Sequence, residues 1–293
     1  MALFHSFAHS SIKGHLSDFF TPEARFERHP GWYAGSSVAF FAKDLVYRTY
    51  ERRLERAVGG GPFPHHVGVI LDGNRRWAKA MGYTDTAEGH RRGAAKIDEL
   101  LSWCVEMDIP IVTLWLLSTE NLSRDPEEVG ALLEIIEDKV RALSNDQDWR
   151  VRTLGAMDLL PDATRELIER AQESSATHTV RQLNVAVGYG GRQEIADAMK
   201  RLMESYSEEG MELDEAAKRV TPDEIARFLY TAGLPDPDLI IRTSGEVRLS
   251  GFLLWQSAHS EFYFCDPYWP DFRKIDFLRA VRSYQLRARR FGR

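Results

Sequence analysis

The feature that most constrains the fold is a regular alternation, starting at Pro64, between apolar runs of strand length and longer segments with helical periodicity. The predicted strands are His66–Leu71, Ile111–Leu117, Val151–Leu154, Leu183–Val187 and Leu239–Ile241. Strands that are separated by helices pair most readily in parallel, with the helices covering the sheet. The order therefore predicts an α/β fold in which a single domain has a mostly parallel central sheet flanked by helices.

The clearest predicted helix follows Ser123. Asp125 is predicted as its N-cap and Pro126 as its first residue, and Glu128 stands at the capping-box position. The apolar positions repeat at the spacing of one helical face: Val129, Leu132, Leu133, Ile136, Val140 and Leu143. This pattern predicts a helix over residues 126–143 with one apolar side.

The first part of the chain has a different character. Residues 1–60 contain scattered aromatic side chains with weak periodicity, and Gly59, Gly60, Gly61 and Pro62 follow them. We expect an N-terminal extension over residues 1–60, helical from about Phe40 to Ala57, and one domain over residues 61–293. The extension could dock on that domain or lie on a membrane surface, and the sequence leaves both open.

Composition excludes several functional classes. The 293 residues carry a formal net charge of −6, which argues against general nucleic-acid binding. The two cysteines, Cys104 and Cys265, lack metal-site spacing and are predicted to be reduced thiols. No apolar run reaches the length of about 20 residues that spans a bilayer. A cytoplasmic protein is expected, with peripheral membrane contact as an option for the extension.

Four polar segments follow predicted strands. "DGNRRW" follows the first strand, "STENLSR" the second, "GYGGR" the fourth and "RTSGEVRLS" the fifth. In an open parallel sheet, the carboxyl ends of the strands form the ligand-binding edge. Any one of these segments could be an ordinary turn, but together they predict a single crevice.

The crevice is expected to bind phosphate, because arginine forks match phosphate oxygens and glycine lets backbone N–H groups approach an anion. These segments supply Arg75, Arg76, Arg124, Arg192, Arg242 and Arg248, with glycines at positions 73, 188, 190 and 191. The P-loop pattern is absent, "GYGG" fits the dinucleotide fingerprint poorly, and no nucleophile elbow occurs. ATP hydrolysis, nicotinamide chemistry and serine hydrolysis are therefore disfavoured.

Two carboxylates and one apolar surface complete the predicted site. Asp72 and Glu261 have the hard oxygen atoms that Mg²⁺ takes, although either could instead pair with an arginine. The strand over residues 111–117 and the apolar side of the helix over residues 126–143 could line a hydrophobic slot, or could simply be core. A diphosphate head above an apolar slot describes a prenyl diphosphate.

At this point the motifs resemble a known family. "HHVGVILDGNRRWAKAMG", "LLSTENLSR", "VAVGYGGRQEI" and "DPDLIIRTSGEVRLSGFLLWQSAHSEFYF" are similar to the cis-prenyltransferases, also called the undecaprenyl diphosphate synthase family, over Pro64 to Arg293. The chain most resembles the short-chain actinobacterial members that make Z,E-farnesyl diphosphate. The resemblance implies a homodimeric, Mg²⁺-dependent enzyme that condenses isopentenyl diphosphate with an allylic diphosphate.

The resemblance also assigns site residues. Asp72 is implied as the essential aspartate that engages Mg²⁺ and diphosphate, Glu261 as the second metal carboxylate, and Asn121 as the proton acceptor. Because a carboxamide is a very weak base, we expect Asn121 to act as a relay, with diphosphate oxygen as the final base. The cradle of the allylic diphosphate is implied to be Gly73, Asn74, Arg75, Arg76 and Trp77, and His90 matches the substrate-binding histidine of the family's Gly-His segment. The isopentenyl diphosphate pocket is implied to be Arg242, Arg248, Leu249 and Ser250, and the loop between the substrates to be Ser118, Thr119, Glu120, Asn121 and Arg124.

Departures from the family pattern bear on product length. Leu116 stands where longer-chain relatives have a small residue, and Leu122 where many have tryptophan. A loop arginine is replaced by the stretch containing Asp85 and Thr86. We expect a fifteen-carbon product from geranyl diphosphate, with a longer-chain synthase and a non-catalytic partner subunit as alternatives. Arg290, Phe291 and Gly292 resemble a C-terminal motif that reaches the partner's diphosphate site.

Overall fold

The structure is a computed structural model that describes residues 37–291, with side chains described over residues 46–287. The chain divides into two compact units, Met1–Thr49 and Tyr50–Arg293. In the first unit, the described residues belong to the start of helix α1 (Ser37–Val58). The predicted helix of the N-terminal extension is therefore present, while residues 1–36, with most of the scattered aromatics, lie outside the described residues.

The second unit is built on a six-stranded sheet in the order β3-β4-β2-β1-β5-β6. All five neighbouring pairs are parallel. The strands are β1 (His66–Ile70), β2 (Ile111–Trp115), β3 (Trp149–Leu154), β4 (Arg181–Ala186), β5 (Leu239–Arg242) and β6 (Glu261–Phe264). The chain leaves β1 toward β2 on one side and later returns to β5 on the other. This reversal opens a crevice at the carboxyl ends of the central strands.

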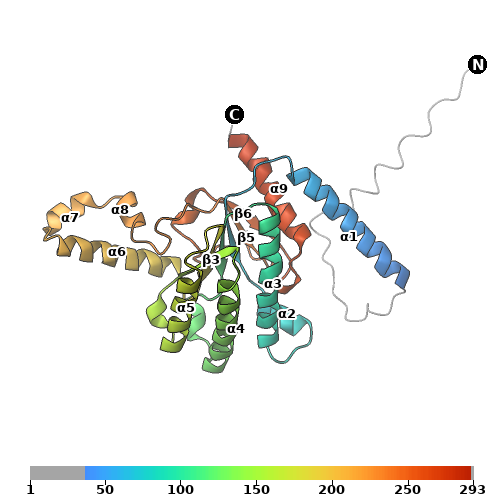
Figure 1. Cartoon of the computed structure of the whole chain (residues 1–293), viewed down its shortest axis with the longest axis horizontal. Helices are drawn as coiled ribbons and strands as arrows, with labels where there is room; N and C mark the ends of the chain where they lie inside the picture. The colour runs from blue at the N-terminus through green and yellow to red at the C-terminus, as the bar shows by residue number, and fades with distance from the viewer. Residues whose placement is uncertain (1–36, 292–293) are drawn as a thin grey trace, which may run out of the picture. The chain divides into compact units, whose positions relative to one another are not determined.

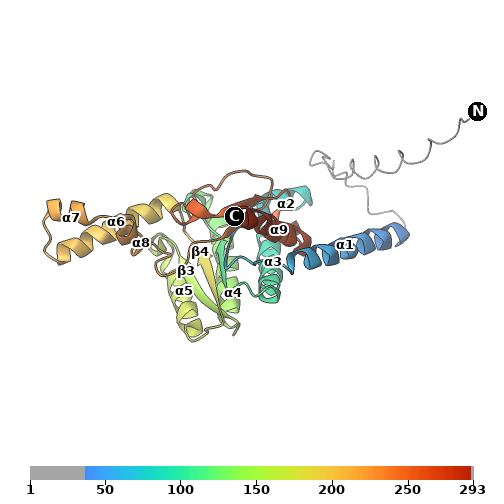
Figure 2. The ribbon, with the colours of Figure 1, turned by 90° about the horizontal axis from the view of Figure 1, so that it is seen from above.

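Helices cover the sheet, as the α/β prediction requires. They are α2 (Asn74–Ala80), α3 (Ala87–Glu106), α4 (Pro126–Ser144), α5 (Asp162–Ser175), α6 (Gly191–Glu208), α7 (Leu213–Arg219), α8 (Pro222–Ala226) and α9 (Lys274–Phe291), with short 3₁₀ turns between. Helices α3, α4 and α5 lie side by side (Figure 1). Helix α6 runs outward from the sheet and carries α7 and α8 (Figure 2), around a separate apolar cluster that includes Leu202 and Tyr206.

The predicted fold class is confirmed, and the predicted strands are present with ends that differ by no more than two residues. Strand β6 was not predicted. It is an edge strand with four half-buried residues and contains no aliphatic side chain, whereas each predicted strand contains Val, Ile or Leu. None of the helices in the described part of the chain has the length and apolarity that a bilayer crossing needs.

Helix α4 begins as predicted, with one difference. The side chain of Asp125 accepts hydrogen bonds from the backbone N–H groups of Glu127 (3.0 Å) and Glu128 (3.3 Å). The capping box is not reciprocal, because the Glu128 carboxylate faces Arg124 and Arg75 instead. The apolar side of the helix is buried as predicted, at positions including Leu132 and Ile136.

The last turns of α1 belong to the second unit. Leu54 and Val58 are only 1% and 2% exposed and form part of the main core. The guanidinium of Arg279 lies over the ring of Tyr50, 5.3 Å from its centroid. These contacts support the docking alternative for the end of the extension, whereas membrane contact of the extension stays a prediction.

Candidate active site

The loop after β1 positions Asp72 at the carboxyl edge of the sheet. Gly73 follows it with φ = 106°, a left-handed conformation that favours glycine. A Cβ at Gly73 would lie 2.7 Å from Cδ1 of Tyr268 and 3.1 Å from Cβ of Ser244. Glycine is therefore required both for the turn and for the close approach of the β5 loop, and α2 starts at the next residue.

Asp72 is held by two arginines. Its Oδ2 accepts a hydrogen bond from Nη2 of Arg242 at 2.8 Å, and its Oδ1 accepts one from Nη2 of Arg76 at 3.1 Å. Burial alone would raise the pKa of Asp72, but the hydrogen bond and charge of Arg242, with help from Ser244 and Arg76, lower the pKa below its ordinary value. The carboxylate is therefore ionised at neutral pH.

Arg242 links Asp72 to the loop that follows β5. Its side chain is 5% exposed, and Nη1 donates to Oγ of Ser250 (2.7 Å) and to the backbone carbonyl of Arg248. Glu246 then joins two further arginines, with its carboxylate oxygens 3.0 Å from Nη1 of Arg76 and 2.5 Å from Nη1 of Arg248. Alternating charges thus fix the guanidinium groups on this side of the cavity.

A second cationic group forms around α4. Oε1 of Glu128 lies 3.4 Å from Nε of Arg75 and 3.1 Å from Nη1 of Arg124. His90 lines the cavity beside them, and its Nε2 is buried without a hydrogen-bond partner among the described residues. Burial and the nearby charge of Arg124 lower the pKa of His90 to about 4, so the imidazole is neutral at neutral pH. A neutral ring of this kind can donate a hydrogen bond to an anionic ligand.

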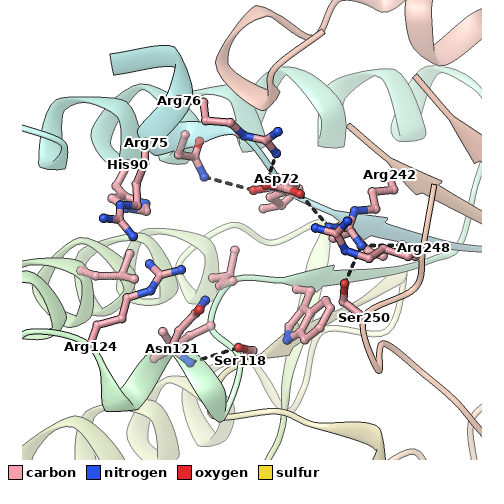
Figure 3. A pocket seen from close by; sticks show the side chains of 18 of the residues that line it. Asp72, Arg75, Arg76, His90, Ser118, Asn121, Arg124, Arg242, Arg248 and Ser250 are labelled. Carbon is pink, nitrogen blue, oxygen red and sulfur yellow. Dashed lines mark hydrogen bonds and ion pairs between the residues drawn. The ribbon is translucent and has the colours of Figure 1, made fainter. Parts of the chain in front are cut away.

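These groups face a cavity of about 590 Å³ at the carboxyl ends of β1, β2 and β5. Arg75, His90 and Arg124 lie on one side and Arg242, Arg248 and Ser250 on the other, with Asp72 between them across from Asn121 and Ser118 (Figure 3). The cationic side chains that line it are Arg75, Arg76, Lys79, Arg124, Arg242 and Arg248. Among the described residues, Asp72 is the one carboxylate of the lining, so the cavity is strongly cationic in a chain of net charge −6.

The floor of the cavity is apolar. Leu71, Trp115, Leu116 and Leu132 contribute to it, and Trp115 stacks on Phe252 with ring centroids 5.3 Å apart. A narrow cavity of about 30 Å³ adjoins this floor and is bounded mostly by apolar side chains of α3 and α4. Leu116 borders both cavities, so its side chain lies at the junction between the large cationic cavity and the narrow apolar cavity, the slot.

The structure brings together most of the predicted site residues. Those that line the large cavity are Asp72, Gly73, Asn74, Arg75, Arg76, His90, Leu116, Ser118, Asn121, Arg124, Arg242, Arg248 and Ser250. The two adjacent arginines separate, because Arg75 joins the group at Glu128 and Arg76 joins the group at Glu246. The cavity therefore has two cationic groups, and Arg76 belongs to the one that contains Arg248 and not to that of Arg75.

Other predicted residues lie outside the cavity lining: Trp77, Thr119, Glu120, Leu122, Leu249 and Glu261. Trp77 is buried, donates from Nε1 to Asp271 (2.9 Å) and stacks on Tyr83 with centroids 5.9 Å apart. Trp77 therefore anchors α2 and does not line the cavity. Leu122 packs against the main core beside Gly188.

The "GYGGR" segment does not reach the cavity, and the expected convergence of four segments involves three. Tyr189 is fully buried, and its hydroxyl donates to Glu194 at 2.5 Å. A Cβ at Gly190 would lie 2.7 Å from Oγ1 of Thr119, and one at Gly191 would lie 2.5 Å from the carbonyl oxygen of Gly251. These glycines allow neighbouring loops to pack closely, and the segment supports the "STENLSR" loop.

Glu261 and Asp72 lie at opposite ends of the sheet within one chain. Glu261 starts β6 and pairs in register with Leu239, the first residue of β5, whereas Asp72 follows the last residue of β1. The Glu261 carboxylate lies 2.5 Å from Nη1 of Arg287. No cluster of three or more His, Cys, Asp or Glu side chains suited to a metal occurs among the described residues.

Two further residues contribute to the site without having been predicted. Lys79 lines the cavity, and Glu128 orients Arg75 and Arg124. Lys79 could have been found from helical spacing, because it stands four residues after Arg75 on α2 and so shares its face. Glu128 was interpreted only as a capping residue, and its second role depends on tertiary contacts.

Known proteins resemble this chain over most of its length. The family model described as "Putative undecaprenyl diphosphate synthase" matches residues 70–292. A (2Z,6E)-farnesyl diphosphate synthase from Thermobifida fusca is 60% identical over 247 residues, which is 84% of this chain and 97% of that protein. The enzyme of the same name from Mycolicibacterium smegmatis is 50% identical over 255 residues, covering 86% of this chain and 97% of that protein.

A solved structure is also similar. Lavandulyl diphosphate synthase from Lavandula x intermedia, crystallised with dimethylallyl diphosphate, aligns with a TM-score of 0.70 and 34% identity over 76% of this chain and 95% of that chain. The resemblance inferred from the motifs is confirmed, and the chain belongs to the undecaprenyl diphosphate synthase family of cis-prenyltransferases.

Proposed function

We propose that this enzyme condenses isopentenyl diphosphate with a short allylic diphosphate, geranyl diphosphate, to give the fifteen-carbon (2Z,6E)-farnesyl diphosphate. The observation that carries the proposal is the pairing of two cationic groups on opposite sides of one cavity with a narrow apolar slot at its floor. Two diphosphates and one short hydrocarbon chain would fill such a site. The names of the relatives from Thermobifida and Mycolicibacterium support the same product.

Each cationic group is assigned one diphosphate. The group of Arg75, Arg124 and His90 adjoins the mouth of the slot, since His90 borders both cavities, and it would bind the allylic diphosphate. The group of Arg242, Arg248 and Ser250 would bind isopentenyl diphosphate. In this arrangement the allylic chain enters the slot while the isopentenyl double bond stays near Asn121.

A magnesium ion fits the site through Asp72. Its carboxylate is ionised, lines the cavity and lies between the two cationic groups. Mg²⁺ usually takes one or two carboxylates and completes its shell with water and substrate phosphate, so a single aspartate is a suitable anchor. When bound, the ion would supply positive charge to the departing diphosphate.

The protein's own residues would then carry the reaction. Arg75 and Arg124 stabilise negative charge on the allylic diphosphate as its C–O bond breaks, an electrostatic contribution of the kind often worth about 3 kcal/mol per donor. The isopentenyl double bond attacks the allylic carbon, and a proton leaves the adjacent carbon to form the new double bond. The backbone N–H of Asn121 donates a hydrogen bond to Oγ of Ser118 (3.2 Å), which holds the loop that presents Asn121 to the cavity. Because a carboxamide is a weak base, we assign it a relay toward diphosphate oxygen.

Leu116 is proposed to limit product length. Its side chain borders both the large cavity and the slot, so a growing chain must pass it. Overlap with a packed side chain is costly, and small-to-large changes in a tight interior typically cost about 1 to 3 kcal/mol. A longer-chain synthase, the alternative product class, would need the growing chain to pass Leu116 and extend along the slot.

A homodimer is proposed as the active form. Strand β6 is an edge strand with half-buried, stacked Phe262 and Phe264, a surface that another subunit would cover. Glu261 on this strand would then bind a metal only at a site formed together with the partner subunit. The C-terminal motif at Arg290, Phe291 and Gly292 has side chains outside the described residues and keeps its role as a prediction. The non-catalytic alternative is disfavoured because Asp72 and both arginine groups are present.

The proposal is tested by incubating the purified chain with radiolabelled isopentenyl diphosphate, geranyl diphosphate and Mg²⁺, followed by reversed-phase chromatography. A labelled fifteen-carbon product that requires all three components supports it. Absence of any condensation product, with the protein shown to be folded, would favour a non-catalytic subunit. Products of fifty carbons or more would select the longer-chain alternative.

A further inference from the structure

Lys139 of α4 borders the far part of the apolar slot, and its ammonium group pairs with Asp98 of α3. We infer that this pair is a second determinant of product length, which acts below Leu116 and sets the upper limit of chain growth. The inference rests on the proposed function and extends it to the end of the slot.

The slot runs between α3 and α4, away from the cationic cavity. On α4 its wall passes from Leu132, which also borders the large cavity, through Ile135 and Ile136 to Lys139. At 1.5 Å per residue, Lys139 lies about 10 Å further along the helix than Leu132. On α3 the wall passes from His90 to Ile97, and Asp98 follows directly. The two helices therefore bring Lys139 and Asp98 to the same depth.

The pair joins the helices at that depth. Nζ of Lys139 lies 3.0 Å from Oδ1 and 2.9 Å from Oδ2 of Asp98. The lysine side chain is 13% exposed while the aspartate is 63% exposed. The aliphatic part of Lys139 is thus covered by the slot wall while its ammonium group reaches the surface carboxylate, the usual arrangement of a half-buried lysine.

A hydrocarbon chain that filled the slot would meet this side chain end-on. To grow further it would have to displace Lys139 and separate its ammonium from Asp98. Separating the pair leaves a charged group without its partner, and leaving the pair in place sets apolar carbon against a charged group, so both are unfavourable. Leu116 would act first, at the mouth, and the ion pair would act on any chain that passes it. The effect of the ion pair on product length should therefore appear once Leu116 has been shortened.

The experiment compares Leu116→Ala with the double variants Leu116→Ala/Lys139→Ala and Leu116→Ala/Asp98→Ala. The second double variant keeps the lysine and removes its anchor, which separates the pair from simple volume. Lys96→Ala in the same background is the matched control, since Lys96 is also 13% exposed and pairs with a surface carboxylate on α3, Glu99, without bordering the slot. Products are resolved by reversed-phase chromatography after dephosphorylation.

Both double variants are expected to make products at least one five-carbon unit longer than Leu116→Ala alone, and the Lys96→Ala control is expected to match Leu116→Ala. Product distributions identical to that of Leu116→Ala, or an equal shift in the control, would overturn the inference. A product shift in the Lys139→Ala double variant alone would also overturn it, because volume and not the pair would then set the limit. The wild-type product separately tests the proposed function, since a folded wild type without condensation activity would refute that function and not the ion pair alone.

Discussion

Asp72 and Glu246 allow a sharp test of the metal assignment, because the two carboxylates are equally exposed. Each side chain is 26% exposed, and each pairs with two arginines. If Asp72 served only to neutralise arginines, Asp72→Asn and Glu246→Gln should have similar effects. If Asp72 holds the metal and diphosphate, its loss should be much more damaging.

The expected magnitude follows from these contacts. Removing one electrostatic contribution to a developing diphosphate charge typically lowers turnover by about 10²- to 10³-fold, or about 3 to 4 kcal/mol. We therefore expect turnover of Asp72→Asn to fall by about 10³-fold, and that of Glu246→Gln by about tenfold or less. Arg242 is 5% exposed and loses a charged partner in Asp72→Asn, so stability should also fall, by about 1 to 3 kcal/mol.

The assay measures initial rates with radiolabelled isopentenyl diphosphate over a range of Mg²⁺ concentrations, with circular dichroism as the check on folding. Glu246→Gln should keep the wild-type dependence on Mg²⁺, whereas Asp72→Asn should lose activity at every Mg²⁺ concentration. Turnover of the two variants within threefold of each other would refute the assignment of a metal role to Asp72.

Three further predictions follow from other parts of the fold. Burial lowers the pKa of His66 to about 4, so the unfolded state binds an extra proton between pH 6.5 and 4. The free energy of unfolding should therefore fall by up to about 3 kcal/mol as pH falls through that window. Urea unfolding at pH 7 and pH 5 should show this loss, and the free energy of unfolding of His66→Gln should depend less on pH. Gly93→Ala should lower the melting temperature by several degrees, because its Cβ would lie 2.3 Å from Oδ1 of Asn74 and 2.9 Å from Cδ1 of Trp269; an unchanged value would show that α3 can shift freely. Deleting Arg290–Arg293 should raise the KM for isopentenyl diphosphate without unfolding the protein, and unchanged kinetics would assign the tail to a solvated helix end.

Much of the site could be predicted because its residues are local to strand ends. The segments containing Asp72, Asn121 and Arg242 each follow a strand with a strong apolar pattern, and parallel pairing then places them at one edge. The same reasoning could not separate Arg75 from Arg76. Their different partners, Glu128 on α4 and Glu246 after β5, are remote in sequence and depend on packing.

Other features depended on information that local patterns do not carry. The glycines at 190 and 191 have the composition of an anion-binding loop, yet their lack of a side chain serves close contact with Thr119 and Gly251. Glu261 shows the same limit, because β6 contains no aliphatic residue and was not recognised as a strand. Without β6, the parallel register that sets Glu261 at the opposite end of the sheet from Asp72 was not accessible.

The central claim is that this chain adds one isopentenyl unit to geranyl diphosphate with Z geometry, and the configuration and length of the product test it most directly. The enzyme product would be dephosphorylated and compared by gas chromatography with (2Z,6E)-farnesol, (2E,6E)-farnesol and longer polyprenols. We predict a single main alcohol that coelutes with (2Z,6E)-farnesol. Coelution with the all-E isomer, or a main product longer than fifteen carbons, would contradict the account.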